Sequence, residues 1–95
     1  MTTKPHIPCE FHIEEDTLLS YGGRAESVTV PEGIRVIGTG AFKACVSLKK
    51  ISLPQSVRVI MAEAFKGCRK LEDIQIPSNL THIGPYAFHR CHSLT

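Results

Sequence analysis

Cysteines and histidines are the side chains of this 95-residue sequence best suited to bind a metal or to attack a substrate. Three of the four cysteines, Cys45, Cys68 and Cys91, stand 23 residues apart, and none belongs to the C-x-x-C or H-x-x-x-H pairs typical of zinc sites. We expect these three to be small buried apolar groups, with a metal site or a disulfide as the alternatives. Cys9 falls outside this spacing and is predicted to be the exposed thiol.

Histidines near the end of the sequence offer a second set of metal ligands, at His82, His89 and His92. Counted by the 23-residue spacing, Cys91 takes the position of Cys45 and Cys68, which we expect to be buried, whereas His89 takes the position of the charged Lys43 and Lys66. This difference argues against a shared site. Nucleophilic catalysis needs a nucleophile held beside a base, and neither a G-x-S-x-G element nor a glycine-rich phosphate loop is present. The sequence predicts neither an enzyme nor a bound cofactor or metal.

Other residue types recur with the same 23-residue spacing as the cysteines, so the whole sequence unit repeats. Proline recurs at 31, 54 and 77, Ala-Phe at 41–42, 64–65 and 87–88, and leucine at 48, 71 and 94. Each proline follows an apolar-polar-apolar triplet, such as residues 51–53. The alternation predicts a short strand whose middle residue faces away from its two neighbours, and the proline ends the strand because it cannot donate a ladder hydrogen bond.

Each unit also contains a second short extended segment, such as residues 34–37, then a turn of small residues and a brief helical turn that holds Ala-Phe. A 23-residue unit fits a leucine-rich repeat of 20–29 residues better than the longer all-helical repeats. The predicted fold class is therefore α/β: a solenoid of short parallel strands, one per repeat, with compact helical or turn returns. Because coils stack about 4.8 Å apart, each core position needs the same kind of side chain in every coil.

The units follow the pattern Pro-x-x-(Ile/Val)-x-x-Ile-Gly-x-x-Ala-Phe-x-x-Cys-x-x-Leu-x-x-Ile-x-Leu-Pro. This pattern resembles the BspA-type leucine-rich repeat found in bacterial and protozoan proteins. The resemblance implies about three repeats in residues 25–95, the last one incomplete, after an N-terminal segment and capping hairpin in residues 1–24. Met61 departs from the pattern where the other units have glycine, and His82 departs where they have valine.

The outward-facing residues of the predicted strands are the candidate binding surface, by the geometry of a solenoid and by analogy with the family. Alternation places six polar residues on this concave face: Ser27, Thr29, Lys50, Ser52, Asp73 and Gln75. They differ between units while the core columns repeat. We therefore expect a non-enzymatic module that recognises a protein or another cell-surface macromolecule. A purely structural capping or spacer role in a longer array is the alternative from another class.

Two basic columns support a third hypothesis, the binding of a polyanion. Arg35 is expected to lie over Arg58, and Lys43 over Lys66. Like charges that face each other across a ladder repel, so an anionic partner could compensate them; otherwise these long side chains extend into water. Nucleic acid is not the expected partner.

Composition and charge limit the classes of protein to which this chain can belong. With 42% hydrophobic and 21% charged residues, the chain is of an ordinary globular kind, and no apolar stretch reaches the roughly 18 residues that a membrane span requires. No signal peptide is apparent, so a cytoplasmic location is expected, or the cell surface or secretion if an upstream signal was removed. Residues 1–32 carry six acidic and two basic residues, giving −4, and residues 33–95 carry nine basic and three acidic residues, giving +6.

The end of the third unit predicts one further property. Leu48 and Leu71 are each followed by a strand triplet, whereas the equivalent Leu94 is followed only by Thr95. The strand of residues 74–76 is therefore expected to be the last of its sheet, with an unpaired edge and uncovered apolar side chains beyond it. We expect the chain to self-associate end to end through residues 74–95, most simply by two-fold pairing of identical ends.

Overall fold

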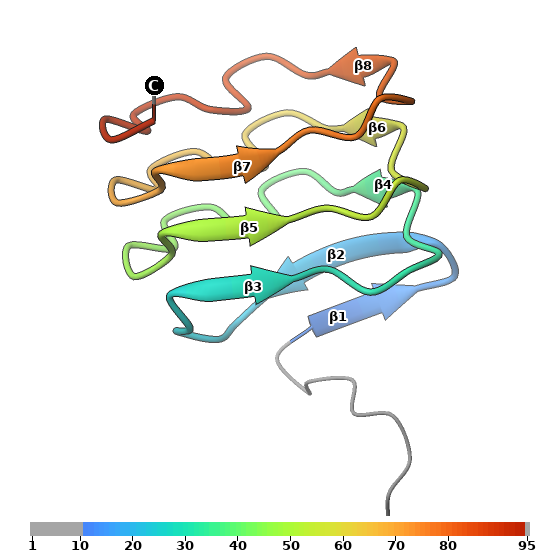
Figure 1. Ribbon diagram of the computed structural model, residues 1–95, viewed down its shortest axis with the longest axis horizontal. Helices are drawn as coiled ribbons and strands as arrows, with labels where there is room; N and C mark the ends of the chain where they lie inside the picture. Colours follow the sequence, from blue (N-terminus) through green and yellow to red (C-terminus); the bar gives the residue numbers. More distant parts are fainter. Residues whose placement is uncertain (1–10, 95) are drawn as a thin grey trace, which may run out of the picture.

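The computed structural model describes residues 11–94 of the chain. Short strands joined by turns wind into coils that stack along one axis (Figure 1). In chain order the strands are β1 (Phe11–Glu14), β2 (Thr17–Tyr21), β3 (Ser27–Thr29), β4 (Val36–Ile37), β5 (Lys50–Ser52), β6 (Val59–Ile60), β7 (Asp73–Gln75) and β8 (His82–Ile83). The described residues contain no helix, and therefore none that could cross a membrane.

The strands form two sheets on opposite sides of the stack (Figure 1). One sheet has the order β3-β5-β7, and the other has the order β1-β2-β4-β6-β8. Strands β1 and β2 form an antiparallel hairpin, and β2 then pairs in parallel with β4. The hairpin therefore covers the first coil on the side of the five-stranded sheet. Each coil after it adds one parallel strand to each sheet.

Equivalent residues of successive coils lie beside one another in the three-stranded sheet. Val28 pairs with Ile51, and Ile51 pairs with Ile74, a step of 23 residues each time. Val28 and Ile51 are buried, whereas the residues on either side of them point outward. The strands begin one residue earlier than the apolar triplets, and Val30 still donates a backbone hydrogen bond to Ser52 at 3.0 Å. The parallel strands and their spacing confirm the solenoid predicted from the repeat. The prediction of one strand per repeat is wrong, because each repeat contributes one short strand to each of the two sheets.

A continuous stack of aromatic rings runs through the core. The ring centroids of Phe42 and Phe65 are 5.1 Å apart, and those of Phe65 and Phe88 are 5.3 Å apart, with nearly parallel planes in both pairs. The hairpin extends the stack, because Tyr21 lies 5.2 Å from Phe42, and Phe11 lies 5.2 Å from Tyr21. Phe42 and Phe65 are fully buried, whereas Phe88 in the last coil is only half-buried. The hairpin thus completes the core at one end of the stack.

The helical return predicted for the Ala-Phe segment is wrong, and with it the α component of the predicted class. The N–H groups of Gly40, Phe42 and Ala44 donate to carbonyls of the next coil at 2.7–3.1 Å, while those of the residues between them bond three residues back. The i→i−4 bonds of an α-helix therefore cannot form. Gly40 and Ala44 also have positive φ angles of 65° and 61°. The equivalent residues of the later coils share this left-handed conformation: Glu63, Gly67, Tyr86 and Arg90.

Burial of the cysteine column differs along the stack. Cys68 in the middle coil is fully buried, whereas Cys45 and Cys91 are only half-buried, so the expectation of three buried thiols is wrong at both ends. The thiols of Cys68 and Cys91 each donate to a carbonyl oxygen of the preceding coil at 3.1 Å. A column position is fully covered only when it has a complete neighbour on both sides. Cys9 lies outside the described residues.

The glycine column is set by close approach between coils. A Cβ atom built on Gly84 would lie 2.5 Å from the backbone nitrogen of Ala62, and one on Gly38 would lie 2.9 Å from the carbonyl oxygen of Leu18. Such contacts are too short for any side chain, so glycine is required at both positions. Met61 occupies the same column in the middle coil, and its side chain is largely exposed. The middle coil therefore accommodates a Cβ that the coils on either side exclude.

Candidate functional site

The outward face of β3, β5 and β7, called the open face below, brings all six predicted binding residues together. In one row Ser27 pairs with Lys50, and Lys50 with Asp73. The second row comprises Thr29, Ser52 and Gln75. These residues sit on one face because strand side chains alternate and because the parallel register repeats every 23 residues. Five are exposed, and Ser52 at the centre is partly covered.

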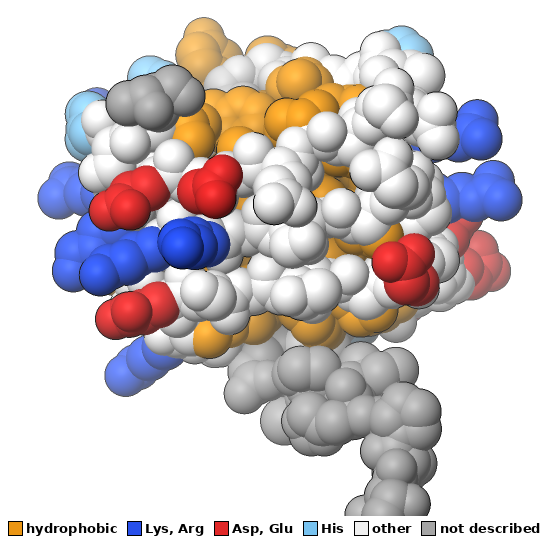
Figure 2. Space-filling view, in the orientation of Figure 1, with side chains coloured by type: hydrophobic (Ala, Val, Ile, Leu, Met, Phe, Trp, Pro, Cys, Tyr) orange, Lys and Arg blue, Asp and Glu red, His pale blue; other side chains and the backbone are white. Residues whose placement is uncertain are grey.

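The open face is hollowed into a shallow groove of about 180 Å³. Its lining consists of the six polar residues with Val28 and Ile51 between the rows. Figure 2 shows blue and red side chains gathered on the left of this face, where the three strands begin, and mostly uncharged side chains across its middle. No aromatic side chain lines the groove. The face can therefore offer hydroxyl and amide groups to a ligand, with charge at one end.

Two opposite charges of the open face have no ion-pair partner among the described residues. Lys50 and Asp73 are direct neighbours in the ladder, yet their charged groups form no ion pair. The adjacent Lys49 instead forms an ion pair with Glu26, with its Nζ atom 4.0 Å from Oε1 of the carboxylate. An ammonium and a carboxylate are thus presented side by side to whatever occupies the groove. Charged groups of this kind favour specificity and orientation in binding more than affinity.

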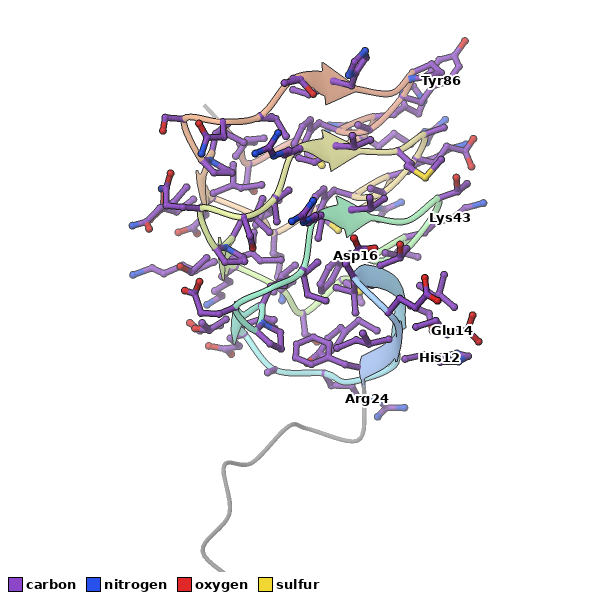
Figure 3. The ribbon with its side chains drawn as sticks, turned by 90° about the vertical axis from the view of Figure 1, so that its right-hand side faces the viewer. His12, Glu14, Asp16, Arg24, Lys43 and Tyr86 are labelled. Carbon is purple, nitrogen blue, oxygen red and sulfur yellow. The ribbon has the colours of Figure 1, made fainter. Side chains whose placement is uncertain are left out.

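The predicted basic columns are arranged differently. Lys43 and Lys66 lie in the turn returns and share one acid, because Glu63 places its two carboxylate oxygens 3.6 Å and 3.4 Å from their ammonium nitrogens. Lys66 first, and then Lys43, lowers the pKa of Glu63 below its usual value. Lys43 projects outward at the side of the stack, as Figure 3 shows. The repulsion between the two lysines is therefore compensated within the chain, and anion binding at this column stays a prediction.

Arg35 and Arg58 form a second, separate column just before β4 and β6. The Nε atom of Arg35 lies 4.0 Å from Oδ2 of Asp16 in the hairpin turn. Arg58 has no ion-pair partner among the described residues. The backbone N–H of Arg58 donates to the carbonyl of Arg35 at 2.8 Å, which places the two residues in adjacent coils. The arginines and the lysines lie on different segments of the coil and do not converge into one basic site.

A larger hollow that the sequence did not indicate lies between the hairpin and the first coil. Its volume is about 430 Å³, and it is bordered by residues 21–25 and 43–48. Gly22, Gly23 and Cys45 are among the residues that line it. Hydrogen bonding with Cys68 lowers the pKa of the Cys45 thiol, while the same interaction and burial raise that of Cys68. The repeat pattern could not reveal this hollow, because it forms where the repeat begins.

The described cysteines and histidines do not gather into a metal site. Within residues 11–94, no group of three or more potential ligands is close enough to hold a metal ion, and Cys45, Cys68 and Cys91 are free thiols. His82 instead contacts the hydroxyl of Thr81 at 3.1 Å. The ring of His89 packs edge-on against Tyr86, with a centroid distance of 5.4 Å. These side chains have local partners in place of a shared ion.

Parallel strands at a constant 23-residue period, around a column of aromatic and aliphatic side chains, define a leucine-rich-repeat solenoid. Residues 13–95 match the family described as BspA type leucine rich repeat region. The chain therefore belongs to the BspA-type leucine-rich-repeat family, as its sequence pattern had indicated. No curated protein matches it significantly.

Solved structures of bacterial proteins share the fold. The leucine-rich-repeat protein of T. pallidum superimposes with a TM-score of 0.87 at 37% identity, over 95% of this chain and 48% of the other. A leucine-rich cell surface protein of Faecalibacterium prausnitzii superimposes with a TM-score of 0.70 at 41% identity, over 74% of this chain and 18% of the other. The chain thus spans about half of the first relative and less than a fifth of the second.

Proposed function

We propose that the chain is a non-enzymatic recognition module whose open face binds an extended segment of a partner protein. The observation that carries the proposal is the groove, which collects Ser27, Thr29, Lys50, Ser52, Asp73 and Gln75 on three parallel strands. The residues of one row are about 4.8 Å apart, and the two rows are two residues, or roughly 6.6 Å, apart along the strands. The second spacing equals the two-residue repeat of an extended peptide that runs along the strands. Lys50 and Asp73, which form no ion pair within residues 11–94, add specificity for a ligand of matching charge order.

Protein is the favoured ligand class because of what lines the groove. Sugar rings and nucleobases are commonly held by stacking on aromatic side chains, and the groove has none. Polyanion binding through the basic columns has weaker support, because Glu63 already offsets half of the charge of Lys43 and Lys66. The F. prausnitzii relative is a cell surface protein, and its similarity supports a surface location for the protein to which this chain belongs. A structural spacer remains the alternative, and it requires no ligand on the open face.

The test is selection of binders to the 95-residue chain from a random peptide library displayed on phage. Selected peptides should bind the Ser52→Trp variant at least about tenfold more weakly, because the indole fills the centre of the groove. His12→Trp is the matched control, since His12 is also an exposed strand residue but lies on the hairpin, away from the groove (Figure 3). Binding to the control should be unchanged. Equal binding to both variants, or no selected peptide, would overturn the proposal and favour the spacer.

A further inference from the structure

Cys45 and Cys68 occupy equivalent positions of adjacent coils, at a place where the two backbones come close together. A Cβ atom built on Gly67, just before Cys68, would lie 3.5 Å from the Cα atom of Ala44, just before Cys45. Figure 1 shows the loops that lead into β5 and β7 one above the other. Equivalent residues of adjacent coils lie about 4.8 Å apart, which falls within the roughly 4.4–6.8 Å between Cα atoms that a disulfide spans.

One backbone carbonyl holds both cysteines. The carbonyl of Phe42 accepts from the backbone N–H of Cys45 at 3.2 Å and from the thiol of Cys68 at 3.1 Å. The two thiols also hydrogen-bond to each other. If the sulfur of Cys68 turns toward Cys45, the carbonyl of Phe42 keeps its bond from the Cys45 N–H. A bond between the two sulfur atoms therefore leaves no buried carbonyl without a donor.

Cys45 differs from the other two described thiols of its column in access and in hydrogen bonding. The thiols of Cys68 and Cys91 donate to carbonyls of the preceding coil, whereas within residues 11–94 the Cys45 thiol has no such acceptor. Cys45 also lines the hollow beside the hairpin, while Cys68 is fully buried. Cys68 lowers the pKa of the Cys45 thiol, and burial raises the pKa of the Cys91 thiol. A small thiol reagent therefore reacts first at Cys45, where the reactive thiolate forms most readily.

The hollow follows from the hairpin that covers the first coil. Residues 22–26 connect β2 to β3, whereas the longer segment of residues 38–49 connects β4 to β5. The shorter connection cannot cover the whole turn of the first coil, and the hollow lies between the two segments. Its lining includes the cations of Arg24 and Lys43 and no acidic residue. Lys43 is paired with Glu63, but Arg24 has no ion-pair partner within residues 11–94, so the hollow favours an anionic reagent.

We propose that Cys45 and Cys68 are a redox-active pair, which a small anionic disulfide oxidises by entering the hollow. The thiolate of Cys45 attacks one sulfur of the reagent, forms a mixed disulfide and releases one thiolate. Cys68 gives its proton to the released thiolate and attacks the sulfur of Cys45. The new bond joins Cys45 to Cys68, and the second thiolate leaves and takes up the proton that Cys45 lost to solvent. Two cysteine thiols are thus oxidised, while one disulfide is reduced to two thiols.

The burial of Cys68 is compatible with its role in the second step. Its pKa is raised first by the hydrogen bond with Cys45 and then by burial. Once Cys45 carries the mixed disulfide, Cys45 is no longer a thiol or a thiolate, so the larger of these two causes is removed. The sulfur that Cys68 attacks belongs to Cys45, its neighbour in the column, so the reagent never has to reach Cys68. An intramolecular attack between adjacent groups is also favoured over attack by a second reagent molecule.

The first test is incubation of the reduced 95-residue chain with glutathione disulfide, in a Cys9→Ser background because Cys9 lies outside the described residues. Peptide mapping by mass spectrometry without reduction should find Cys45 linked to Cys68 as the main product. Cys68→Ala should stop the reaction at a glutathione adduct on Cys45. Cys45→Ser should slow oxidation of Cys68 at least about tenfold. Cys91→Ser is the matched control, because it keeps the pair and should give the same product as the parent chain.

Three results of this experiment would overturn the proposal. They are a bond between Cys68 and Cys91 as the main product, an adduct that persists on Cys45 beside an unreacted Cys68, and no reaction at Cys45. Circular dichroism checks that each variant is folded, since Cys68 is fully buried. Should Cys68→Ala unfold, the product of the Cys91→Ser chain decides the proposal by itself, because that chain keeps both cysteines.

The second test asks whether the reagent enters through the hollow. Cystamine, a cationic disulfide, should react with Cys45 at least about threefold more slowly than glutathione disulfide. Arg24→Gln should reduce this preference, because Arg24 lines the hollow. Arg58→Gln is the matched control, since Arg58 also lacks an ion-pair partner within residues 11–94 but lies before β6, outside the hollow. Equal rates with the two reagents, or equal effects of the two substitutions, would overturn the hollow as the path of entry.

Discussion

The ammonium nitrogen of Lys43 lies 3.6 Å from a carboxylate oxygen of Glu63, and this ion pair joins the turn of one coil to the turn of the next. The other oxygen of Glu63 reaches Lys66 within its own turn at 3.4 Å. One acidic side chain thus holds two basic residues that would otherwise repel each other. Because these side chains are partly exposed, the arrangement makes a small addition to a stability that comes mainly from the buried columns.

Glu63→Gln should destabilise the chain at neutral pH, because it removes the only acid between Lys43 and Lys66. The two lysines lower the pKa of Glu63 in the folded chain, so its stabilising effect is present above the unfolded-state pKa and is lost as pH falls through the folded-state pKa. Urea unfolding at neutral pH and at about pH 2 measures this difference, which should vanish in acid. Glu72→Gln is the control; an equal loss there would show that net charge alone is responsible.

Phe65→Ala should cost about 3–5 kcal/mol of unfolding free energy, because it removes a fully buried ring from the middle of the aromatic stack. Phe88→Ala should cost clearly less, since Phe88 is half-buried and contacts one ring of the stack instead of two. Chemical denaturation followed by circular dichroism gives both values. A loss below about 1 kcal/mol for Phe65→Ala would contradict the packing described above.

Ala44→Gly should stabilise the chain by about 0.5–1 kcal/mol, an uncommon result for a change to glycine. Ala44 has a φ angle of 61°, and Gly67 already occupies the same column with a φ angle of 79°. Glycine removes the steric cost of this left-handed conformation. Ala62→Gly is the comparison, because Ala62 has no positive φ and should lose stability instead. The melting temperatures of the two variants should move in opposite directions.

Thiol labelling in a Cys9→Ser background should proceed in the order Cys45 before Cys68. Cys45 borders the hollow beside the hairpin and has a lowered pKa, whereas Cys68 is fully buried and has a raised pKa. Since the thiolate is the reactive form, both effects act in the same direction. Peptide mapping by mass spectrometry after short exposure to a maleimide identifies the labelled residue. Equal rates at the two cysteines would show that the coils open faster than the reagent reacts.

The repeat was sufficient to predict the strands and the open face, because these depend on positions that every coil shares. The period of 23 aligns Val28, Ile51 and Ile74, and alternation then fixes which neighbours point outward. The turn returns could not be predicted in the same way. Phe42 sits in a pattern compatible with a helical turn, and only the carbonyl of Ala64 in the next coil decides where its N–H donates. That partner is a tertiary contact, which local spacing does not encode.

The ends of the stack were predicted least well, since they break the symmetry on which the columns depend. Cys45 and Cys91 occupy the same column as Cys68 but are half-buried, because the neighbouring layer is incomplete at each of them. The ion pairs of Glu63 were missed for a related reason. Its column contains Gly40, Glu63 and Tyr86, so it has no common residue type, and this irregularity was the only signal available. The sequence therefore predicts where such a variable residue lies in the fold. It does not predict which side chain that residue contacts.

The two tyrosines of the chain are optical reporters at opposite ends of the stack of coils, and only one of them belongs to the aromatic stack. The chain has no tryptophan and two tyrosines: Tyr21 packs against Phe11 and Phe42 under the hairpin, and Tyr86 is exposed in the last coil. Since each coil is supported only by its neighbours, the last coil should open before the hairpin does. Tyrosine fluorescence of the Tyr86→Phe variant would then report the N-terminal layer alone. The order in which the layers melt becomes visible without any added dye.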